Sequence, residues 1–261
     1  MIPYFQVNYF LVGPLTIQVW GLFVAIGVII GVIVGTKLVN KYLLSDDIYL
    51  DLVVWALFSG LIFARIFHIL FYNPEFYVAN PGEIIKFWKG GASSLGGFFG
   101  GSLALYLIYR IRKFKLVDFL PYLDVLSITL WLGMAIGRLG CFVIHDHPGI
   151  LSNFILAVRF PVGSRLDLGF IESILVFGIF GYFYINFKKF VTKKWGLVAV
   201  YSLYTYAVSR FFLDFLRARD LDFSDQRYFA FTPAQWGMIT VIVALTFIIF
   251  SGKISQSLKK N

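Results

Sequence analysis

The feature that most restricts the fold is a series of long apolar runs separated by short polar connections. The runs are roughly 19–25 residues long, the length that an α-helix needs to cross a bilayer. Hydrophobic residues make up 59% of the chain and charged residues only 14%, which is more apolar surface than a water-soluble core of 261 residues requires. Short segments of alternating polarity, the pattern of a membrane β-barrel, do not occur. The sequence therefore predicts an all-α integral membrane protein.

The apolar runs predict seven transmembrane helices in a single polytopic membrane domain, residues 1–261. Their expected ranges are 15–36, 50–72, 93–110, 119–144, 169–187, 196–217 and 233–251.

The distribution of basic residues predicts the orientation. Thirteen of the 23 lysines and arginines lie in one set of connections, and seven lie in the opposite set. Because cytoplasmic loops are rich in lysine and arginine, we expect the N-terminus outside and the C-terminus in the cytoplasm. The longer connections 73–92, 145–168 and 218–232 then lie on the outer side. This distribution also accounts for the net charge of +9, so we expect the bilayer and no nucleic acid as a partner.

An arginine inside an apolar run is the strongest sign of a functional site. The segment 133–149 reads GMAIGRLGCFVIHDHPG, and it begins as membrane helix and ends in a polar corner. An unpaired charge at the centre of a span costs at least ~2.5–3.5 kcal/mol, so Arg138 must face a partner, a cavity or an anionic ligand. Gly133, Gly137 and Gly140 lie three or four residues apart, and they would let another backbone or a lipid chain approach that helix closely.

Two further polar stripes follow helical spacing. In the second span, Arg65, His68 and Tyr72 share one face, although interhelical hydrogen bonding explains His68 equally well. In the sixth span, polar residues also recur on one face, and they are Tyr206, Arg210, Asp214 and Arg217. Asp214 can pair with either arginine one turn away, and a purely structural ion pair is one interpretation of this stripe.

The balance of charge inside the spans indicates an anionic ligand. The intramembrane arginines are Arg65, Arg138 and Arg210, and the main acids at similar depth are Asp124, Glu172 and Asp214. Guanidinium groups bind phosphate oxygens in pairs, and in a membrane that phosphate is most naturally a phospholipid head group. The glycine-dense segment 90–101, which contains Gly96 and Gly97, would either present backbone N–H groups to an anion or allow close helix packing.

The polar corner offers acid–base chemistry. His145 and His147 flank Asp146, and imidazole titrates near neutral pH, so either histidine is a candidate base, with capping and loop hydrogen bonds as the alternative. Two histidines and a carboxylate fall short of a convincing metal site, so we expect no metal and no cofactor. Cys141 is the single cysteine, and it lies three residues from Arg138, where a cation favours the thiolate. The usual role of such a cysteine is a small buried apolar side chain.

An ordered set of short motifs extends over nearly the whole chain. The motifs are VWGL at 19–22, RIFHILFYN at 65–73, WKGG at 88–91, GRLG at 137–140, Gly149, FPVGSR at 160–165, Glu172, SRFFLDFLR at 209–217 and TPAQ at 232–235. In this order the chain resembles the prolipoprotein diacylglyceryl transferase family. The resemblance implies seven membrane helices and an outward-facing head region in the bacterial cytoplasmic (inner) membrane. It also implies transfer of diacylglycerol from phosphatidylglycerol to the lipobox cysteine of a preprolipoprotein, leaving glycerol phosphate.

The chain departs from the family pattern at several positions. Leu95 stands before Gly96-Gly97 where a histidine is usual, Cys141 replaces an asparagine, and Asp214 replaces a glutamate. The corner histidines would then substitute for the missing one. The expected catalytic residues are Arg138, Arg210, His145 and His147. The expected substrate-binding residues are Arg65, Gly96, Gly97, Cys141, Asp146, Gly149, Glu172, Tyr206 and Asp214.

Arg138 and Arg210 are expected to bind the phosphate, because the departing glycerol phosphate must be stabilised in a dry site. The acceptor thiol must also lose its proton, either to a corner histidine or with help from the arginine field alone. Two other functions use the same residues. A relative that binds or translocates phospholipid would keep the cavity without transfer, and an ion-coupled transporter would use the intramembrane charges, although the inverted repeat of many transporters is not visible.

Overall fold

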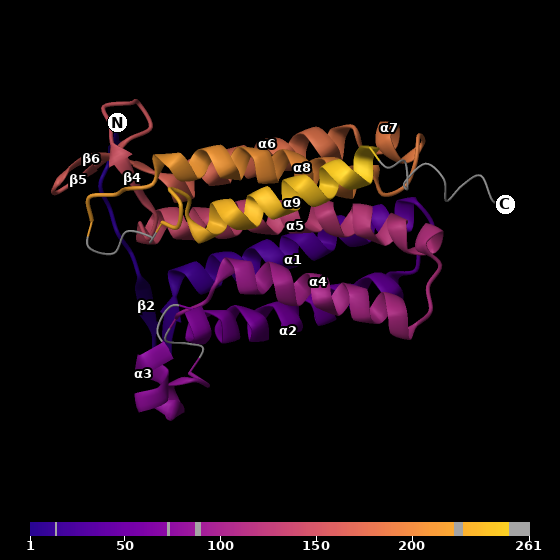
Figure 1. Cartoon of the computed structure of the whole chain (residues 1–261), viewed down its shortest axis with the longest axis horizontal. Helices are drawn as coiled ribbons and strands as arrows, with labels where there is room; N and C mark the ends of the chain where they lie inside the picture. Colours follow the sequence, from indigo (N-terminus) through magenta and orange to yellow (C-terminus); the bar gives the residue numbers. More distant parts are fainter. Residues whose placement is uncertain (14, 72–73, 87–89, 222–226, 251–261) are drawn as a thin grey trace. The chain divides into compact units, whose positions relative to one another are not determined.

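The computed structural model describes residues 1–13, 15–71, 74–86, 90–221 and 227–250, and these are mostly helical (Figure 1). The chain forms two compact units. Unit 1 comprises Met1–Leu38 and Leu123–Asn261, and unit 2 comprises Val39–Tyr122.

Long helices occur at all seven positions indicated by the sequence. They are α1 (Val19–Lys41), α2 (Asp46–Phe71), α4 (Ser94–Ile111), α5 (Leu116–Ile144), α6 (Leu168–Ile185), α8 (Leu197–Leu213) and α9 (Pro233–Phe250). Among the described residues, five of these helices, α1, α2, α5, α6 and α9, are long and apolar enough to cross a membrane. Helix α8 has 17 residues, and α4 has 18 residues with several glycines and tyrosines among its apolar side chains.

Helix boundaries differ from the expected ones where local chemistry decides. The first helix begins at Val19, because Leu15–Gln18 forms strand β3 and pairs with β2 (Tyr9–Val12) in an antiparallel hairpin. The second helix begins earlier than expected, at Asp46, where acidic side chains favour a helix N-terminus. The sixth ends at Leu213, and a 3₁₀ turn, η3 (Asp214–Leu216), follows it.

A small β-sheet in unit 1 was not expected from an all-α reading. Its strands are β1 (Ile2–Pro3), β4 (Pro148–Leu151), β5 (Val158–Phe160) and β6 (Gly163–Asp167), and their order is β1-β5-β6-β4. Strand β1 runs parallel to β5, and the other pairs are antiparallel. Figure 1 shows β4, β5 and β6 beyond the end of α5, next to the polar corner. Strands of two to five residues carry too little periodicity to be read from sequence.

Helix packing within unit 1 depends on the glycines of α5. A Cβ on Gly27 of α1 would lie 2.5 Å from the carbonyl oxygen of Gly133, and one on Gly140 would lie 2.8 Å from Cβ of Phe23. The glycine face of α5 therefore receives the backbone of α1, one of the two options that the sequence left open. On another face of α5, the fully buried Trp131 contacts Tyr206 of α8 with ring centroids 4.9 Å apart. This contact holds α8 against the segment that carries Arg138.

The start of α8 is fixed by a buried carboxylate on α5. Asp124 accepts hydrogen bonds from the backbone N–H groups of Gly196 at 2.7 Å and Ala199 at 2.8 Å. Such a cap satisfies N–H groups that have no partner within the helix. Asp124 is therefore a capping residue, and it does not belong to the arginine cluster described below. The short helix α7 (Phe187–Val191) precedes this point.

Unit 2 is built on the close contact between α2 and α4. A Cβ on Gly96 would lie 2.3 Å from the carbonyl oxygen of Phe63, and one on Gly100 would lie 2.5 Å from that of Ser59. The Ser59 hydroxyl also donates to the Gly100 carbonyl at 2.8 Å. The glycine-dense segment thus allows close helix packing, one of the two roles, with anion binding, that the sequence left open. The short helices α3 (Pro74–Ala79) and η1 (Pro81–Glu83) follow α2.

Candidate functional site

A buried carboxylate joins three helices of unit 1. Glu172 on α6 has 1% of its side chain exposed, and its Oε2 lies 3.1 Å from Nε of Arg138 on α5 and 3.6 Å from Nη1 of Arg210 on α8. The Tyr206 hydroxyl, one turn before Arg210, donates to the other carboxylate oxygen at 2.8 Å. Of the three possibilities for Arg138, which were a partner, a cavity or an anionic ligand, the structure shows a partner, Glu172.

A second buried carboxylate continues the same cluster. Asp214 lies at the start of η3, and its Oδ1 is 3.2 Å from Nη2 of Arg210 and 3.7 Å from Nη1 of Arg217. The sequence predicted that Asp214 can pair with either arginine, and the structure shows contacts with both. Its other oxygen accepts a hydrogen bond from the hydroxyl of Thr232, just before α9. The side-chain oxygen of Gln235 accepts a hydrogen bond from the backbone N–H of Thr232 at 3.0 Å, which fixes Thr232 at the start of α9.

These contacts define the arginine cluster: Arg138, Arg210 and Arg217 with Glu172 and Asp214. Three guanidinium groups face two buried carboxylates, and Asp146 at the edge of the cluster is a third acid within electrostatic reach of Arg138. Arg138 Nη1 contacts the weak acceptor Cys141 Sγ at 3.9 Å, so this donor would be better satisfied by an anion. Such an arrangement can hold a phosphate while the carboxylates fix the orientation of the guanidinium forks.

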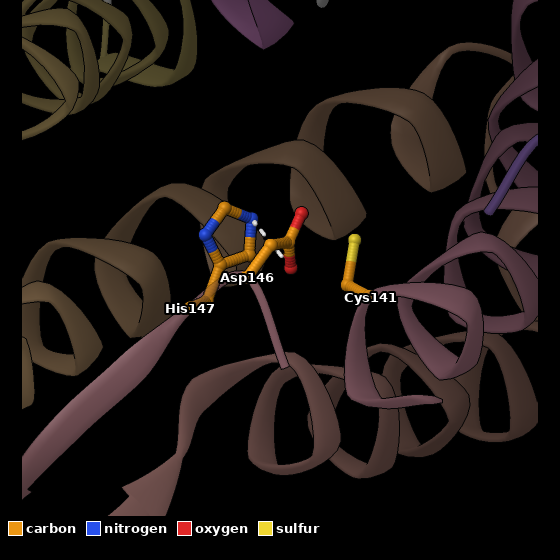
Figure 2. Close-up of side chains that lie close together, drawn as sticks. All are labelled: Cys141, Asp146 and His147. Atoms are coloured by element: carbon orange, nitrogen blue, oxygen red, sulfur yellow. Dashed lines mark ion pairs between the residues drawn. The ribbon is translucent and has the colours of Figure 1, made fainter. Parts of the chain in front are cut away.

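The polar corner, residues 145–147, follows the last turn of α5 and turns the chain back toward it. His145 has a left-handed backbone with φ of 52°, which ends the helix and turns the chain back. Asp146 and His147 then face Cys141, and Figure 2 shows the Asp146 carboxylate between the imidazole and the thiol. The His147 carbonyl accepts from the N–H of Leu168 at 3.0 Å, so the start of α6 holds this turn in place. We call Cys141, Asp146 and His147 the corner triad.

The corner triad brings together three possible metal ligands. One ligand atom from each residue lies within 4.8 Å of the other two, and His147 Nε2 is 3.7 Å from Asp146 Oδ1. Burial raises the pKa of Asp146 to about 6, although the charge of Arg138 opposes this shift. Burial, followed by the charges of Arg138, Arg217 and Arg210, lowers the pKa of His147 well below its ordinary value. The surroundings of His147, including the charges of the arginine cluster, therefore favour the neutral imidazole.

The two corner histidines have different surroundings. The Nδ1 atom of His145 is 2.7 Å from Asp167 Oδ2, and the ring stacks on Tyr4 with centroids 5.2 Å apart. Phe142 and Phe160 contact the ring edge-on. Asp167 also caps α6 by accepting from the Phe170 N–H. His145 therefore lies in an aromatic pocket with its own carboxylate, whereas His147 belongs with the arginines.

Three expected site residues lie in unit 2. Arg65 donates to the carbonyl oxygens of five residues, namely Glu83 (2.6 Å), Ile84 (3.0 Å), Lys86 (3.4 Å), Gly90 (2.5 Å) and Gly91 (2.9 Å). It thereby fastens the segment after η1 onto α2. Gly96 and Gly97 lie on α4, where a Cβ on Gly96 would clash with the Phe63 carbonyl and one on Gly97 would meet ordinary contacts at 3.9 Å. Leu95, at the position of the usual histidine, is 42% exposed. Tyr72, the third residue of the stripe, lies outside the described residues.

Gly149 is placed where a side chain would not fit. It pairs with Arg217 in an isolated bridge, and a Cβ there would lie 2.9 Å from the carbonyl oxygen of Leu216. This bridge joins β4 to the segment after η3 and so positions Arg217. Sequence reasoning did not single out Arg217 or Thr232 as site residues. Arg217 had a signal, since it continues the α8 stripe, but only the fold brings Thr232 to Asp214.

Comparison with known proteins identifies relatives over most of the chain. A family model described as prolipoprotein diacylglyceryl transferase matches residues 7–251. A protein of Chloroherpeton thalassium named phosphatidylglycerol–prolipoprotein diacylglyceryl transferase is 30% identical over 257 residues, covering 97% of this chain and 94% of the relative. Proteins of the same name from Rickettsia conorii (29% identical; 81% of this chain, 83% of the relative) and Staphylococcus aureus MRSA252 (30%; 81% and 78%) are also similar. The chain belongs to the prolipoprotein diacylglyceryl transferase family.

Proposed function

We propose that this protein transfers diacylglycerol from phosphatidylglycerol to the lipobox cysteine thiol of a preprolipoprotein, forming a thioether and releasing glycerol phosphate. The names of the relatives support this reaction, and the arginine cluster supports it physically. The observation that carries it is the pair Arg138 and Arg210, held by one buried carboxylate, Glu172, beside a partly exposed polar corner.

In this reaction the arginine cluster stabilises the leaving group. The bond between the glyceryl carbon and the phosphate oxygen breaks, and its electron pair departs with glycerol phosphate. Arg138 and Arg210 would bind the phosphate oxygens, because preorganised donors in a dry site stabilise charge without reorganising. Glu172, Tyr206 and Asp214 would fix the direction of the guanidinium groups.

Ionisation of the acceptor thiol would fall to the corner triad. His147 is the histidine that shares the surroundings of the arginines, while His145 is engaged by Asp167. Cys141 and Asp146 complete the wall of the site on this side. Gly149 would act indirectly on the site, because its bridge to Arg217 positions that arginine. A side chain at this position would not fit.

We also propose seven transmembrane helices in a single polytopic domain of the bacterial cytoplasmic (inner) membrane, with the N-terminus outside. The excess of basic residues in alternate connections supports this orientation, and it gives the polar corner an outward position. Replacement of Lys113 by cysteine in a Cys141→Ala background tests it. We expect an impermeant thiol reagent to label Lys113→Cys only after permeabilisation, and labelling of intact cells would overturn the topology.

The transfer reaction itself is tested with purified protein, phosphatidylglycerol and a lipobox peptide. Mass spectrometry should show the peptide gaining one diacylglyceryl group, and a peptide with serine in place of the lipobox cysteine should remain unmodified. If the protein retains phosphatidylglycerol but never modifies the peptide, a phospholipid-binding role replaces the enzymatic one.

A further inference from the structure

The corner triad has the composition and the geometry of a three-ligand zinc site. A thiolate, an imidazole and a carboxylate are the donors that suit Zn²⁺, whereas hard cations such as Mg²⁺ favour oxygen donors alone. The sequence alone offered two histidines and a carboxylate, but the fold replaces His145 by Cys141. The change matters because sulfur gives the set a soft, strongly binding donor.

One of the separations between ligand atoms already matches a tetrahedral zinc centre. Metal–ligand distances of about 2.0–2.3 Å place the ligands of a tetrahedron about 3.3–3.8 Å apart. His147 Nε2 and Asp146 Oδ1 are already 3.7 Å apart, and all three ligand atoms lie within 4.8 Å of one another. Figure 2 shows the Asp146 carboxylate between the imidazole, to which it is paired, and the thiol. A shift of the side chains by about an ångström would complete the site.

Two of the three ligand side chains are partly exposed, so a fourth ligand has access to such a centre. The side chains of His147 and Asp146 are 27% and 38% exposed, whereas Cys141 is buried. Catalytic zinc sites have three protein ligands and one exchangeable position, whereas structural sites are closed by four. An incoming thiol could therefore reach the metal from the open side.

The charge of the surroundings also permits a cation. Arg138 Nη1 lies 3.9 Å from the Cys141 sulfur, and Arg210 and Arg217 act on His147. Zn²⁺ with one thiolate, one carboxylate and a neutral imidazole carries no net charge, so the loaded triad presents no net positive charge to the arginine cluster. The surplus of guanidinium over the buried carboxylates Glu172 and Asp214 remains available for a phosphate.

We propose that Cys141, Asp146 and His147 bind Zn²⁺ and that its open position binds the acceptor thiol as a thiolate. This inference rests on the proposed transferase function and specifies how the thiol is ionised in a chain that has Leu95 where a histidine is usual. A thiol that coordinates zinc loses its proton, which passes to water. The thiolate then attacks the glyceryl carbon, the C–S bond forms, and the C–O bond breaks with its electrons leaving on glycerol phosphate. Under this proposal His147 acts as a ligand, and the metal takes the part of the base.

Cobalt(II) provides a direct spectroscopic test. Because Cys141 is the single cysteine of the chain, any thiolate-to-cobalt charge-transfer band of the protein alone must come from it. Metal-free protein, purified with a tag that lacks cysteine and histidine, should bind one equivalent of Co²⁺ and develop this band together with the strong d–d absorption of a tetrahedral site. Cys141→Ser should lose the band, and His147→Ala should bind at least ~10-fold more weakly. His68→Gln, the matched control on α2, should keep both.

The second part of the test asks whether the acceptor thiol binds the metal, and it uses the unmodified protein. Adding a lipobox peptide to the cobalt protein without phosphatidylglycerol should strengthen the charge-transfer band, since a second thiolate joins the metal, and the serine peptide should leave it unchanged. Absence of the band in the folded parent overturns the zinc site. A band that does not respond to the peptide overturns the thiol-activation role.

Transfer activity separates this inference from the proposed function. If the protein transfers diacylglycerol at the same rate before and after removal of metal by a chelator, the transferase proposal holds and the zinc mechanism is wrong. If cobalt binds with the expected spectrum but phosphatidylglycerol and peptide never react, the metal site stands and the transferase proposal fails. We expect loss of transfer on chelation and recovery on addition of Zn²⁺.

Discussion

The two units use an arginine of a long helix in opposite ways. In unit 1, Arg138 lies 3.1 Å from the carboxylate of Glu172, and a thiol is the neighbour of one of its remaining donors. In unit 2, Arg65 donates to five backbone carbonyls of one short segment. A guanidinium paired with a carboxylate can exchange part of its contacts for a ligand anion. One that holds backbone carbonyls cannot do so without releasing the chain, so we infer a structural role for Arg65.

The largest expected effect is on catalysis in unit 1. Arg210→Ala removes a group that pairs with both Glu172 and Asp214, and we expect transfer to fall by roughly 10³-fold or more. Arg138→Lys should recover only part of the activity lost in Arg138→Ala, because an ammonium cannot reproduce the bidentate fork. Initial rates of peptide modification measure both effects. Parent-like rates in the folded alanine variants would remove these arginines from the site.

A smaller effect is expected when Arg65 is replaced in unit 2. Arg65→Lys cannot span the carbonyls of Glu83, Ile84 and Gly90 at once, so residues 83–86 should separate from α2. Limited proteolysis should cut this segment faster than in the parent, while Arg138→Lys should leave the cutting rate unchanged. Equal protection of Arg65→Lys and the parent would contradict the fastening role.

Close helix packing predicts a difference between neighbouring glycines. Gly96→Ala places a methyl group 2.3 Å from the Phe63 carbonyl oxygen, so α2 and α4 must separate, at a cost of about 1–3 kcal/mol in the free energy of unfolding. At Gly97 the nearest contact is an ordinary 3.9 Å, so Gly97→Ala is the matched control and should change stability little. Thermal unfolding in the same detergent compares the two. Similar losses for both variants would mean that this packing does not decide stability.

The smallest effect concerns the four-stranded β-sheet of unit 1. Arg165 on β6 donates hydrogen bonds to Asp220 at 2.9 Å and 2.5 Å, and these bonds lower the pKa of the Asp220 carboxyl. A carboxyl with a lowered folded pKa stabilises the protein above its unfolded pKa of ~3.9, and this stabilisation is lost as the pH falls through the folded value. Asp220→Asn should therefore lower the unfolding temperature slightly at neutral pH and not in acid. A difference that persists in acid would assign the effect to another contact.

Much of the helical fold could be predicted because a span-length apolar run leaves few alternatives. The sequence could predict that the charge of Arg138 must be compensated, although it did not name the compensating residue. It could also predict from helical spacing that Asp214 pairs with an arginine, because a charge in an apolar surrounding needs a partner. The β-sheet could not, because its strands are short and pair residues far apart, such as Ile2 with Val158.

Most residues of the candidate site could be predicted from the sequence, but the pairing of the corner residues could not. Sequence places His145 and His147 in one corner, but the left-handed turn at His145 sends them to different partners. That turn is not encoded by a glycine, so no local signal revealed it. Likewise, Cys141 meets Asp146 and His147 only after the chain reverses.

Phosphatidylglycerol binding, measured by native mass spectrometry on purified variants, most directly tests whether the arginines of unit 1 bind the phosphate and Arg65 of unit 2 does not. We predict that Arg138→Ala and Arg210→Ala each weaken binding by about 10–100-fold, because each loses a charged hydrogen-bonding group to phosphate, while Arg65→Lys binds as the parent does. Parent-like binding in both alanine variants, or an equal loss in Arg65→Lys, would contradict the assignment of the phosphate to the arginine cluster of unit 1.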